Sequence, residues 1–351
     1  MTIAVESKTE GKAILRDLDE LLMTRGLRLN SGKTMVLSAA EAKRFFWADE
    51  NEFLSQQNLA IKAARGDAAL IQAIARRLRR RFDAFRRKQH TGQWDKIYKR
   101  YINIFASLKD SYVLPHCRLL ILEQPALRAE VWRYLAEIGP SEAAFNSIRE
   151  YLVSGDALDD ASIFQSTRAL TLWHVPPGSR MHRRIRNLGR QIGDPKYAER
   201  SPFFFVGALW VLAKYGLKKH MLDLVTSNQA TWEVSSFLAR QVAAIIPKLR
   251  QNRDAKVVRR MIEKHKHAAA NSVLLSLDEM TSVSAPIPGD LRLYILNGKN
   301  ATAYSVQRFL ICFHVLTSNS IDRAERLHLR AELIHYLTDP LYLRVVNAIR
   351  I

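Results

Sequence analysis

The pattern of hydrophobic and polar residues changes character near residue 50. Before that point β-prone runs alternate with amphipathic segments, and residues 2–5 (Thr-Ile-Ala-Val) and 34–37 (Thr-Met-Val-Leu) both favour strands. Between them, residues 8–24 place apolar side chains three and four positions apart, which predicts a helix with one apolar face. The first 50 residues are therefore expected to form strand, helix, short strand, turn, strand and helix.

Capping residues mark the ends of the first predicted helix. Ser7 precedes Glu10 by three positions, the spacing of a capping box. Gly26 is expected to end the helix, because glycine accepts the left-handed conformation found at helix C-termini. The predicted strands are too few for an independent sheet, so we expect this α/β segment to lack part of its layer on the N-terminal side.

From residue 51 onward the pattern is that of successive amphipathic helices separated by Gly, Pro and Asp. It is clearest in residues 203–215, 217–227 and 230–250. Helices of this length in series are typical of a HEAT-like stack of helical hairpins, and an irregular helical domain is the alternative because no fixed period is present. The predicted fold is mainly α.

Three segments follow from these patterns. Residues 1–50 form the short N-terminal α/β segment, residues 51–110 a set of basic helices, and residues 111–351 an all-helical, HEAT-like repeat domain. The length of 351 residues allows each helical part a sizeable core.

The net charge of the chain indicates what kind of molecule it binds. Lys and Arg total 54 against 34 Asp and Glu, a net charge of +20 with a pI near 10.1, so the chain attracts polyanions. Nucleic acid is favoured over an anionic membrane surface because the densest basic run is rich in arginine rather than lysine. RNA or an RNA–DNA duplex is the predicted partner.

Cysteines and hydropathy give the expected compartment. Cys117 and Cys312 are the only cysteines, which predicts neither a disulfide framework nor a cysteine-based zinc site. The longest apolar run, residues 203–213, is too short to span a bilayer, and the polar start has no signal-peptide pattern. We expect a cytoplasmic protein without a membrane partner.

The densest basic run covers residues 76–88 and reads RRLRRRFDAFRRK. On a helix, Ile71, Ile74, Ala75, Leu78, Phe82 and Phe85 form one apolar stripe. The cations then form the outer surface, and all are predicted to contact nucleic-acid phosphates: Arg76, Arg77, Arg79, Arg80, Arg81, Arg86, Arg87 and Lys88. A looser group, Arg180, Arg183, Arg184, Arg186 and Arg190, is a second candidate patch, with a solvated charged face as its alternative.

The stretch Ser31-Gly32-Lys33-Thr34 has the ending of a phosphate-binding loop. That motif, G-x-x-x-x-G-K-[ST], would need glycine at position 27, which is Leu27, and a helix after the threonine. A β-prone run follows instead, so a P-loop is excluded.

Residues 2–46 as a whole resemble the end of the palm domain of bacterial reverse transcriptases of the retron, group II intron and abortive-infection types. Residues 3–5 match the strand that follows the catalytic turn, and residues 13–22 match the next helix. The family segment Gly-Leu-x-Leu-Asn-x-x-Lys-Thr is matched by Gly26, Leu27, Leu29, Asn30, Lys33 and Thr34.

The resemblance implies the C-terminal portion of an RNA-directed DNA polymerase, a nucleotidyltransferase of antiviral defense. The metal-binding Tyr-x-Asp-Asp turn would precede residue 1 and is absent, so no catalytic set is complete and no metal site is expected here. Mg²⁺ would bind only with a complete palm. The missing part is explained by a truncated gene, by an internal start, or by a split arrangement in which a palm and fingers part is encoded separately. By the resemblance Lys33 is an auxiliary acid, Gly26 and Asn30 shape the turn, residues 51–110 form a thumb, and a helical-repeat domain follows.

Two alternatives remain at this point. One is a non-enzymatic helical scaffold that binds RNA or protein. The other is a helical ribonuclease of HEPN type, which carries an Arg-x4–6-His pair on one helix; Arg330 and His335 fit that spacing.

Overall fold

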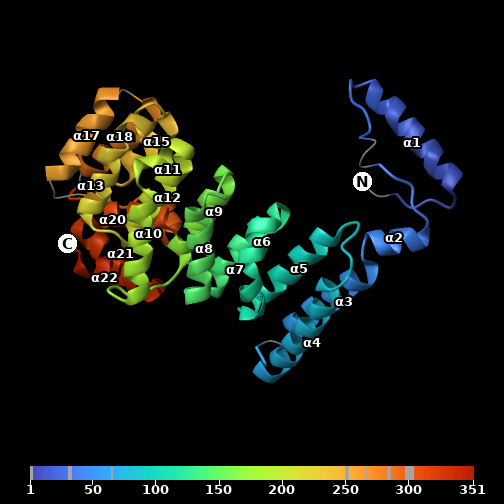
Figure 1. Ribbon diagram of the computed structural model, residues 1–351. Coiled ribbons are helices and arrows are strands. Elements are labelled where there is room, and N and C mark those ends of the chain that lie inside the picture. Colours follow the sequence, from blue (N-terminus) through green and yellow to red (C-terminus); the bar gives the residue numbers. More distant parts are fainter. Residues whose placement is uncertain are drawn as a thin grey trace. The chain divides into compact units, whose positions relative to one another are not determined.

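The structure, a computed structural model, describes residues 3–30, 34–64, 66–249, 253–265, 267–282, 286–296 and 304–351 (Figure 1). The chain divides into two compact units, Met1–Ile104 and Phe105–Ile351. The described residues are mainly helical, as the sequence predicts.

The described residues of the N-terminal unit form five helices in chain order. They are α1 (Lys8–Met23), α2 (Ala39–Phe45), α3 (Ala48–Ala63), α4 (Ala68–Arg86) and α5 (Trp94–Ser107), the last of which runs across the division between the units. α3 packs against α4, and α2 against α3.

The two ends of α1 follow the local signals. The Ser7 hydroxyl accepts a hydrogen bond from the Glu10 N–H at 3.1 Å, while the Glu10 carboxylate accepts from the Glu6 N–H at 2.8 Å rather than from Ser7. Gly26 ends the helix with a φ of +69°, and the Leu27 N–H donates to the Leu22 carbonyl at 2.9 Å. The predicted C-terminal glycine is confirmed, and the predicted capping box is only half formed.

The predicted palm strands are wrong: none of the described residues of the N-terminal unit forms a strand. Residues 3–5 and 34–37 are irregular, although Val5 and Val36 still lie over α1, where a Cβ on Gly11 would approach them to 3.4 and 3.2 Å. A strand is stable only when its N–H and C=O groups pair with neighbouring strands. The described residues supply no such neighbours, so β-prone sequence alone does not make the layer.

The C-terminal unit is all helical in its described residues. Its elements are η1 (Ser111–His116), α6 (Cys117–Glu123), η2 (Pro125–Leu127), α7 (Arg128–Ile138), α8 (Glu142–Ser154), α9 (Asp160–Leu172), α10 (Arg180–Ile192), α11 (Pro195–Arg200), α12 (Pro202–Tyr215), α13 (Lys218–Ser227), α14 (Gln229–Glu233), α15 (Ser236–Ala244), α16 (Ile246–Leu249), α17 (Arg253–His265), α18 (Ala268–Ser282), α19 (Gly289–Leu296), α20 (Val306–Thr317), α21 (Arg323–Tyr336) and α22 (Pro340–Ala348).

Helix α12 is the centre of this unit. It packs chiefly against α9 and α10 (Figure 1). Nearly all of its side chains are buried because the segment is apolar on every side. The predicted helix over residues 230–250 is instead broken into α14, α15 and α16. Ser235 begins α15 by accepting a hydrogen bond from the Leu238 N–H at 3.4 Å, and Pro247 lacks the N–H that a continuous helix would use.

Helices of this unit pack mainly on near neighbours in the chain, such as α7 on α9 and α10 on α12. This is consistent with stacked hairpins but fixes no repeat. The HEAT-like arrangement therefore stays a prediction, and a mainly α fold is what the structure establishes.

Candidate nucleic-acid interface

Helix α4 is held in place by its apolar stripe. Asp67 caps it, accepting hydrogen bonds from the Ala69 and Leu70 N–H groups at 2.9 and 3.1 Å. Five of the six residues of the stripe predicted from the sequence are buried, Ile74, Ala75, Leu78, Phe82 and Phe85, and the sixth, Ile71, is half-buried. Because this buried face holds α4 in one orientation, the opposite face of the helix points away from the core of the N-terminal unit.

Aromatic rings lock the C-terminal half of α4. Phe82 and Phe85 contact Tyr98 and Tyr101 of α5 with ring centroids 5.1–5.9 Å apart. Trp47 packs edge-on to Phe85 at 5.1 Å and donates its indole N–H to the Thr91 carbonyl at 2.8 Å. Contacts of this kind stabilise beyond simple burial, so the helix is a rigid support for its charged face.

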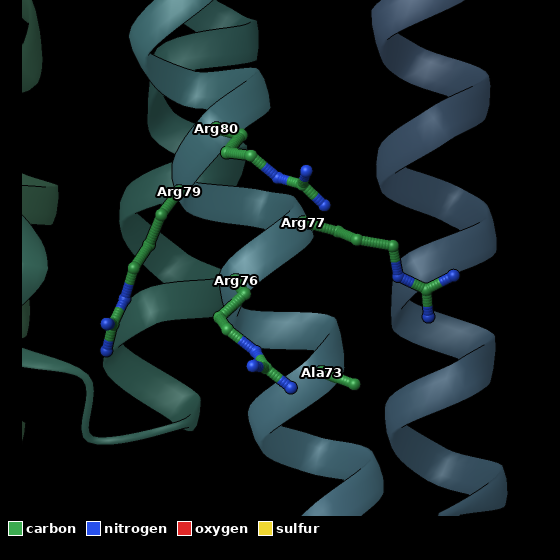
Figure 2. Close-up of a pocket in the computed structure, with 5 residues that line it drawn as sticks. All are labelled: Ala73, Arg76, Arg77, Arg79 and Arg80. Atoms are coloured by element: carbon green, nitrogen blue, oxygen red, sulfur yellow. The ribbon is translucent and has the colours of Figure 1, made fainter.

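The outer surface of α4 carries four arginines, which we name the arginine face: Arg76, Arg77, Arg79 and Arg80. Together with Ala73 they line a surface hollow of about 760 Å³. Figure 2 shows Arg79 on one side of the helix, Arg77 and Arg80 on the other, and Arg76 between them. Their spacings of three and four residues make them neighbours on one helix.

Within the part of the chain that the structure describes, three of the four positive charges of this face are not neutralised by a neighbouring side chain. Arg76, Arg77 and Arg80 are exposed, and no carboxylate among the described residues pairs with any of the three. Like charges at these spacings repel. A polyanion laid along α4 would relieve that repulsion and gain charge-assisted hydrogen bonds to guanidinium groups.

Arg81 and Lys88, also predicted to bind nucleic acid, have an internal partner. The carboxylate of Glu50, which is 2% exposed, pairs with Arg81 Nε at 3.0 Å and Lys88 Nζ at 3.3 Å and accepts the Tyr101 hydroxyl at 3.0 Å. Burial and the nearby Glu50 charge raise the pKa of Tyr101, so its hydroxyl remains a donor. These two cations stabilise the unit by compensating a buried carboxylate. Nothing in the local sequence pattern singles out Glu50.

Arg86 and Arg87 lie at the end of α4. The Arg86 guanidinium lies 3.9 Å from the Asp83 carboxylate and 5.7 Å from the centroid of the Phe82 ring. Arg87 is exposed. Of this pair, Arg87 extends the positive surface.

The predicted turn residues fall partly within the described chain. Gly26 has the positive φ expected of it, and the Asn30 carbonyl accepts a hydrogen bond from the Thr34 hydroxyl at 2.9 Å. Asp19 ties this loop to α1, because its carboxylate accepts from the Leu29 N–H at 3.0 Å. Lys33, the auxiliary acid implied by the resemblance, lies outside the described residues.

Arg330 and His335, the ribonuclease pair, both lie on α21. Arg330 donates to the Asn347 and Ile349 carbonyls at 2.9 and 3.3 Å, which holds the C-terminal end of α22. His335 is exposed. Five residues on a helix separate two side chains by about 140° around its axis, so the pair does not converge through α21 alone.

The arginines of the second candidate patch, on α10, differ in what they contact. Arg184 of α10 pairs with Glu142, donates to the Asn146 side chain at 2.9 Å and lies 4.4 Å from the Phe145 ring centroid. Its role is to join α10 to α8. Arg183 and Arg186 belong to a separate pocket, described below.

Comparisons with known proteins give no relative: no family model matches the chain, and neither a curated protein nor a solved structure is similar to it. Among the described residues, no group of three or more His, Cys, Asp or Glu side chains is placed to hold a metal ion. Nor does any described helix have the length and apolar character needed to cross a membrane. Function therefore has to be argued from the charged surface of α4.

Proposed function

We propose that this chain binds nucleic acid through the arginine face of α4. The observation that carries the proposal is that Arg76, Arg77 and Arg80 are exposed and lack carboxylate partners on a helix whose other face is fully buried. Arginine exposed in this way matches phosphate groups, which it can bind through two N–H donors at once.

The expected contact is with the backbone rather than with base edges. Arginine side chains without other hydrogen-bonding groups contact phosphates, and no aromatic or amide side chain accompanies the four arginines around the hollow they line. RNA or an RNA–DNA duplex is the ligand we propose, with affinity that depends strongly on salt and weakly on sequence.

We further propose that the chain is the C-terminal portion of a reverse transcriptase of antiphage defence type. The support is the spacing of Gly26, Asn30 and the other matched residues, together with α1 at its expected place. On this view the polymerase aspartates and Mg²⁺ come with a separately encoded palm and fingers part.

The apolar face of α1 supports a missing partner. Gly11, which has no side chain, is the one buried residue of α1, while Leu21 is 61% exposed. A hollow of about 680 Å³ beside it is lined by Ile14, Leu15 and Leu18 and by residues of the 34–37 segment. An amphipathic helix usually buries such a stripe, and palm strands would cover it.

The test of the interface removes three charges at once. The variant Arg76→Gln, Arg77→Gln, Arg80→Gln is compared with a matched control on α17, Lys256→Gln, Arg260→Gln, Lys264→Gln, whose residues are equally exposed. Binding of a labelled RNA–DNA duplex is measured by fluorescence anisotropy from 50 to 300 mM salt. For the α4 variant we expect weaker binding and a salt slope reduced by about 0.7–0.9 per lost phosphate contact.

The control loses the same net charge at a different place on the chain. We therefore expect it to lose much less affinity, because its three residues lie outside the arginine face. Equal losses in both variants would refute a defined interface on α4. The reverse-transcriptase part has its own test: if the coding sequence next to this one, in any frame, contains no palm with a Tyr-x-Asp-Asp turn, that part fails. A nucleic-acid-binding scaffold would then remain.

A further inference from the structure

A second basic pocket, of about 820 Å³, lies within the C-terminal unit. Its walls come from α10, from the end of α12, from the start of α13, from α16, from the C-terminal half of α20, and from α22 with the residues that follow it. Its cationic lining comprises Arg183, Arg186, Lys218, Lys248, Arg344 and Arg350. None of the described residues that line it carries a carboxylate side chain, so the pocket has no negative charge of its own to offset the cations.

Lys214 also lines this pocket but is already compensated. Its ammonium pairs with Asp339 and donates to the Thr171 and Trp173 carbonyls at 2.9 and 2.8 Å. Among the other cations, Arg183 donates to the Gly178 carbonyl at 2.7 Å, a hydrogen bond that does not neutralise its charge.

His182 is a buried polar group in the wall of the pocket. The residue is 8% exposed, its ring packs edge-on to Tyr215 with centroids 5.5 Å apart, and its Nδ1 has no hydrogen-bond partner among the described residues. Buried polar atoms are nearly always satisfied by protein, water or ligand. This unsatisfied nitrogen is an observation independent of the surface charge.

Three arginines of the pocket influence the protonation of His182. Burial, followed by the charges of Arg186, Arg344 and Arg183, lowers its pKa, so the imidazole is held neutral by the same arginines that line the pocket. The pKa of Lys248 is also lowered: burial and the charge of Lys218 bring it to about 8. The lowered pKa values of His182 and Lys248 therefore both reflect the positive charge of neighbouring cations.

We propose that this pocket binds a phosphorylated small molecule of nucleotide size. Its volume falls within the range of small-molecule sites. Arg183, Arg186 and Arg344 suit phosphate oxygens, and the start of α13 adds the positive end of a helix. Apolar lining residues, Phe313, Leu341 and Val345, provide surface for the part of the ligand that carries no charge. The proposal does not depend on α4 binding nucleic acid.

The experiment uses the full chain and three probes: ATP, inorganic tripolyphosphate and adenosine, each titrated by calorimetry. We expect ATP and tripolyphosphate to bind and adenosine not to. Arg186→Gln with Arg344→Gln should weaken ATP binding about ten-fold or more, because charged hydrogen bonds are lost. The control Lys256→Gln with Arg260→Gln should leave it unchanged. Tighter binding of ATP than of tripolyphosphate would show that the nucleoside part also makes contacts.

A second readout locates the site. The ¹H–¹³C imidazole signal of His182 should shift when ATP binds, and Lys218→Gln with Arg350→Gln should weaken that response as well. Failure of both ATP and tripolyphosphate to bind, or ATP binding that neither variant pair weakens and that leaves the His182 signal in place, would overturn the proposal. If instead only an RNA–DNA duplex shifts that signal, the pocket belongs to a nucleic-acid surface and the small-molecule proposal is wrong.

Discussion

At the scale of single residues, the sequence predicted what depends on local spacing. The buried stripe of α4 and the C-terminal Gly26 follow from periodicity and backbone preference, and both are confirmed. Glu50 could not be predicted, because a buried carboxylate with Arg81 and Lys88 as partners is created by packing between helices. The same packing gives those two predicted phosphate-binding cations an internal partner.

Gly92 is the residue where the backbone leaves least room. Its φ is +60°, and a Cβ there would lie 2.4 Å from the Phe45 carbonyl oxygen, because the Gln93 N–H bonds that carbonyl at 2.9 Å. Gly92→Ala should therefore destabilise the N-terminal unit by about 3 kcal/mol or more.

Gly66 offers a matched control for this change. It also has a positive φ, +91°, but a Cβ would meet nothing within 4 Å. Gly66→Ala should cost only about 1–2 kcal/mol. Urea unfolding of both variants measures the difference, and equal losses would contradict the close approach at Phe45.

At the scale of elements, helices formed where the sequence placed them and strands did not. A helix satisfies its backbone internally, so periodicity and caps predict it well, as for α1, α4 and α12. The 34–37 segment had strand propensity without a partner, and pairing is a non-local property that a short window does not contain. The break of residues 230–250 into three helices depends on Ser235 and Pro247, single residues whose effect periodicity hides.

One ion pair joins α12 to the start of α22. Lys214 is 2% and Asp339 1% exposed, and Asp339 also caps α22 by accepting the Leu341 N–H at 2.9 Å. Asp339→Asn keeps a capping oxygen but removes the negative charge that compensates the ammonium, and Lys214→Met removes the positive charge that compensates the carboxylate. Either single change should cost about 3–5 kcal/mol, since a buried charge loses its partner.

The double variant, Lys214→Met with Asp339→Asn, should be more stable than either single one, because it removes both charges together. Thermal and urea unfolding of the four proteins gives the coupling energy. Strict additivity would show that the pair contributes nothing through its charges.

At the scale of the whole molecule, the basic composition indicated a polyanionic partner and the structure places exposed cations in two distinct settings. On α4 they line an open surface hollow, which suits an extended backbone. In the C-terminal unit they line a pocket with an unsatisfied histidine. Net charge alone cannot separate these two, because it says nothing about curvature or about which cations are already paired.

The same charge distribution determines how the C-terminal unit responds to acid. Burial would raise the pKa of Asp339, but hydrogen bonds from His174, Lys214 and Leu341 and the Lys214 charge outweigh it and lower that pKa. Burial is likewise outweighed at Asp159, whose pKa is lowered by hydrogen bonds from Ser162 and by Arg128. Below the unfolded-state value of about 3.9 the unfolded chain takes up these protons first, so stability falls as pH drops through the folded pKa.

We therefore expect the free energy of unfolding of this unit to change little above about pH 5 on account of these carboxylates, and to decline steeply below about pH 4. Urea unfolding, followed by intrinsic fluorescence at intervals from pH 6 to pH 2.5, measures this decline. In Asp339→Asn the decline should be shallower, because one of the groups that gains a proton on unfolding is gone. An equally steep decline in that variant would mean that Asp339 has an ordinary pKa in the folded protein, contrary to its position between Lys214 and the start of α22.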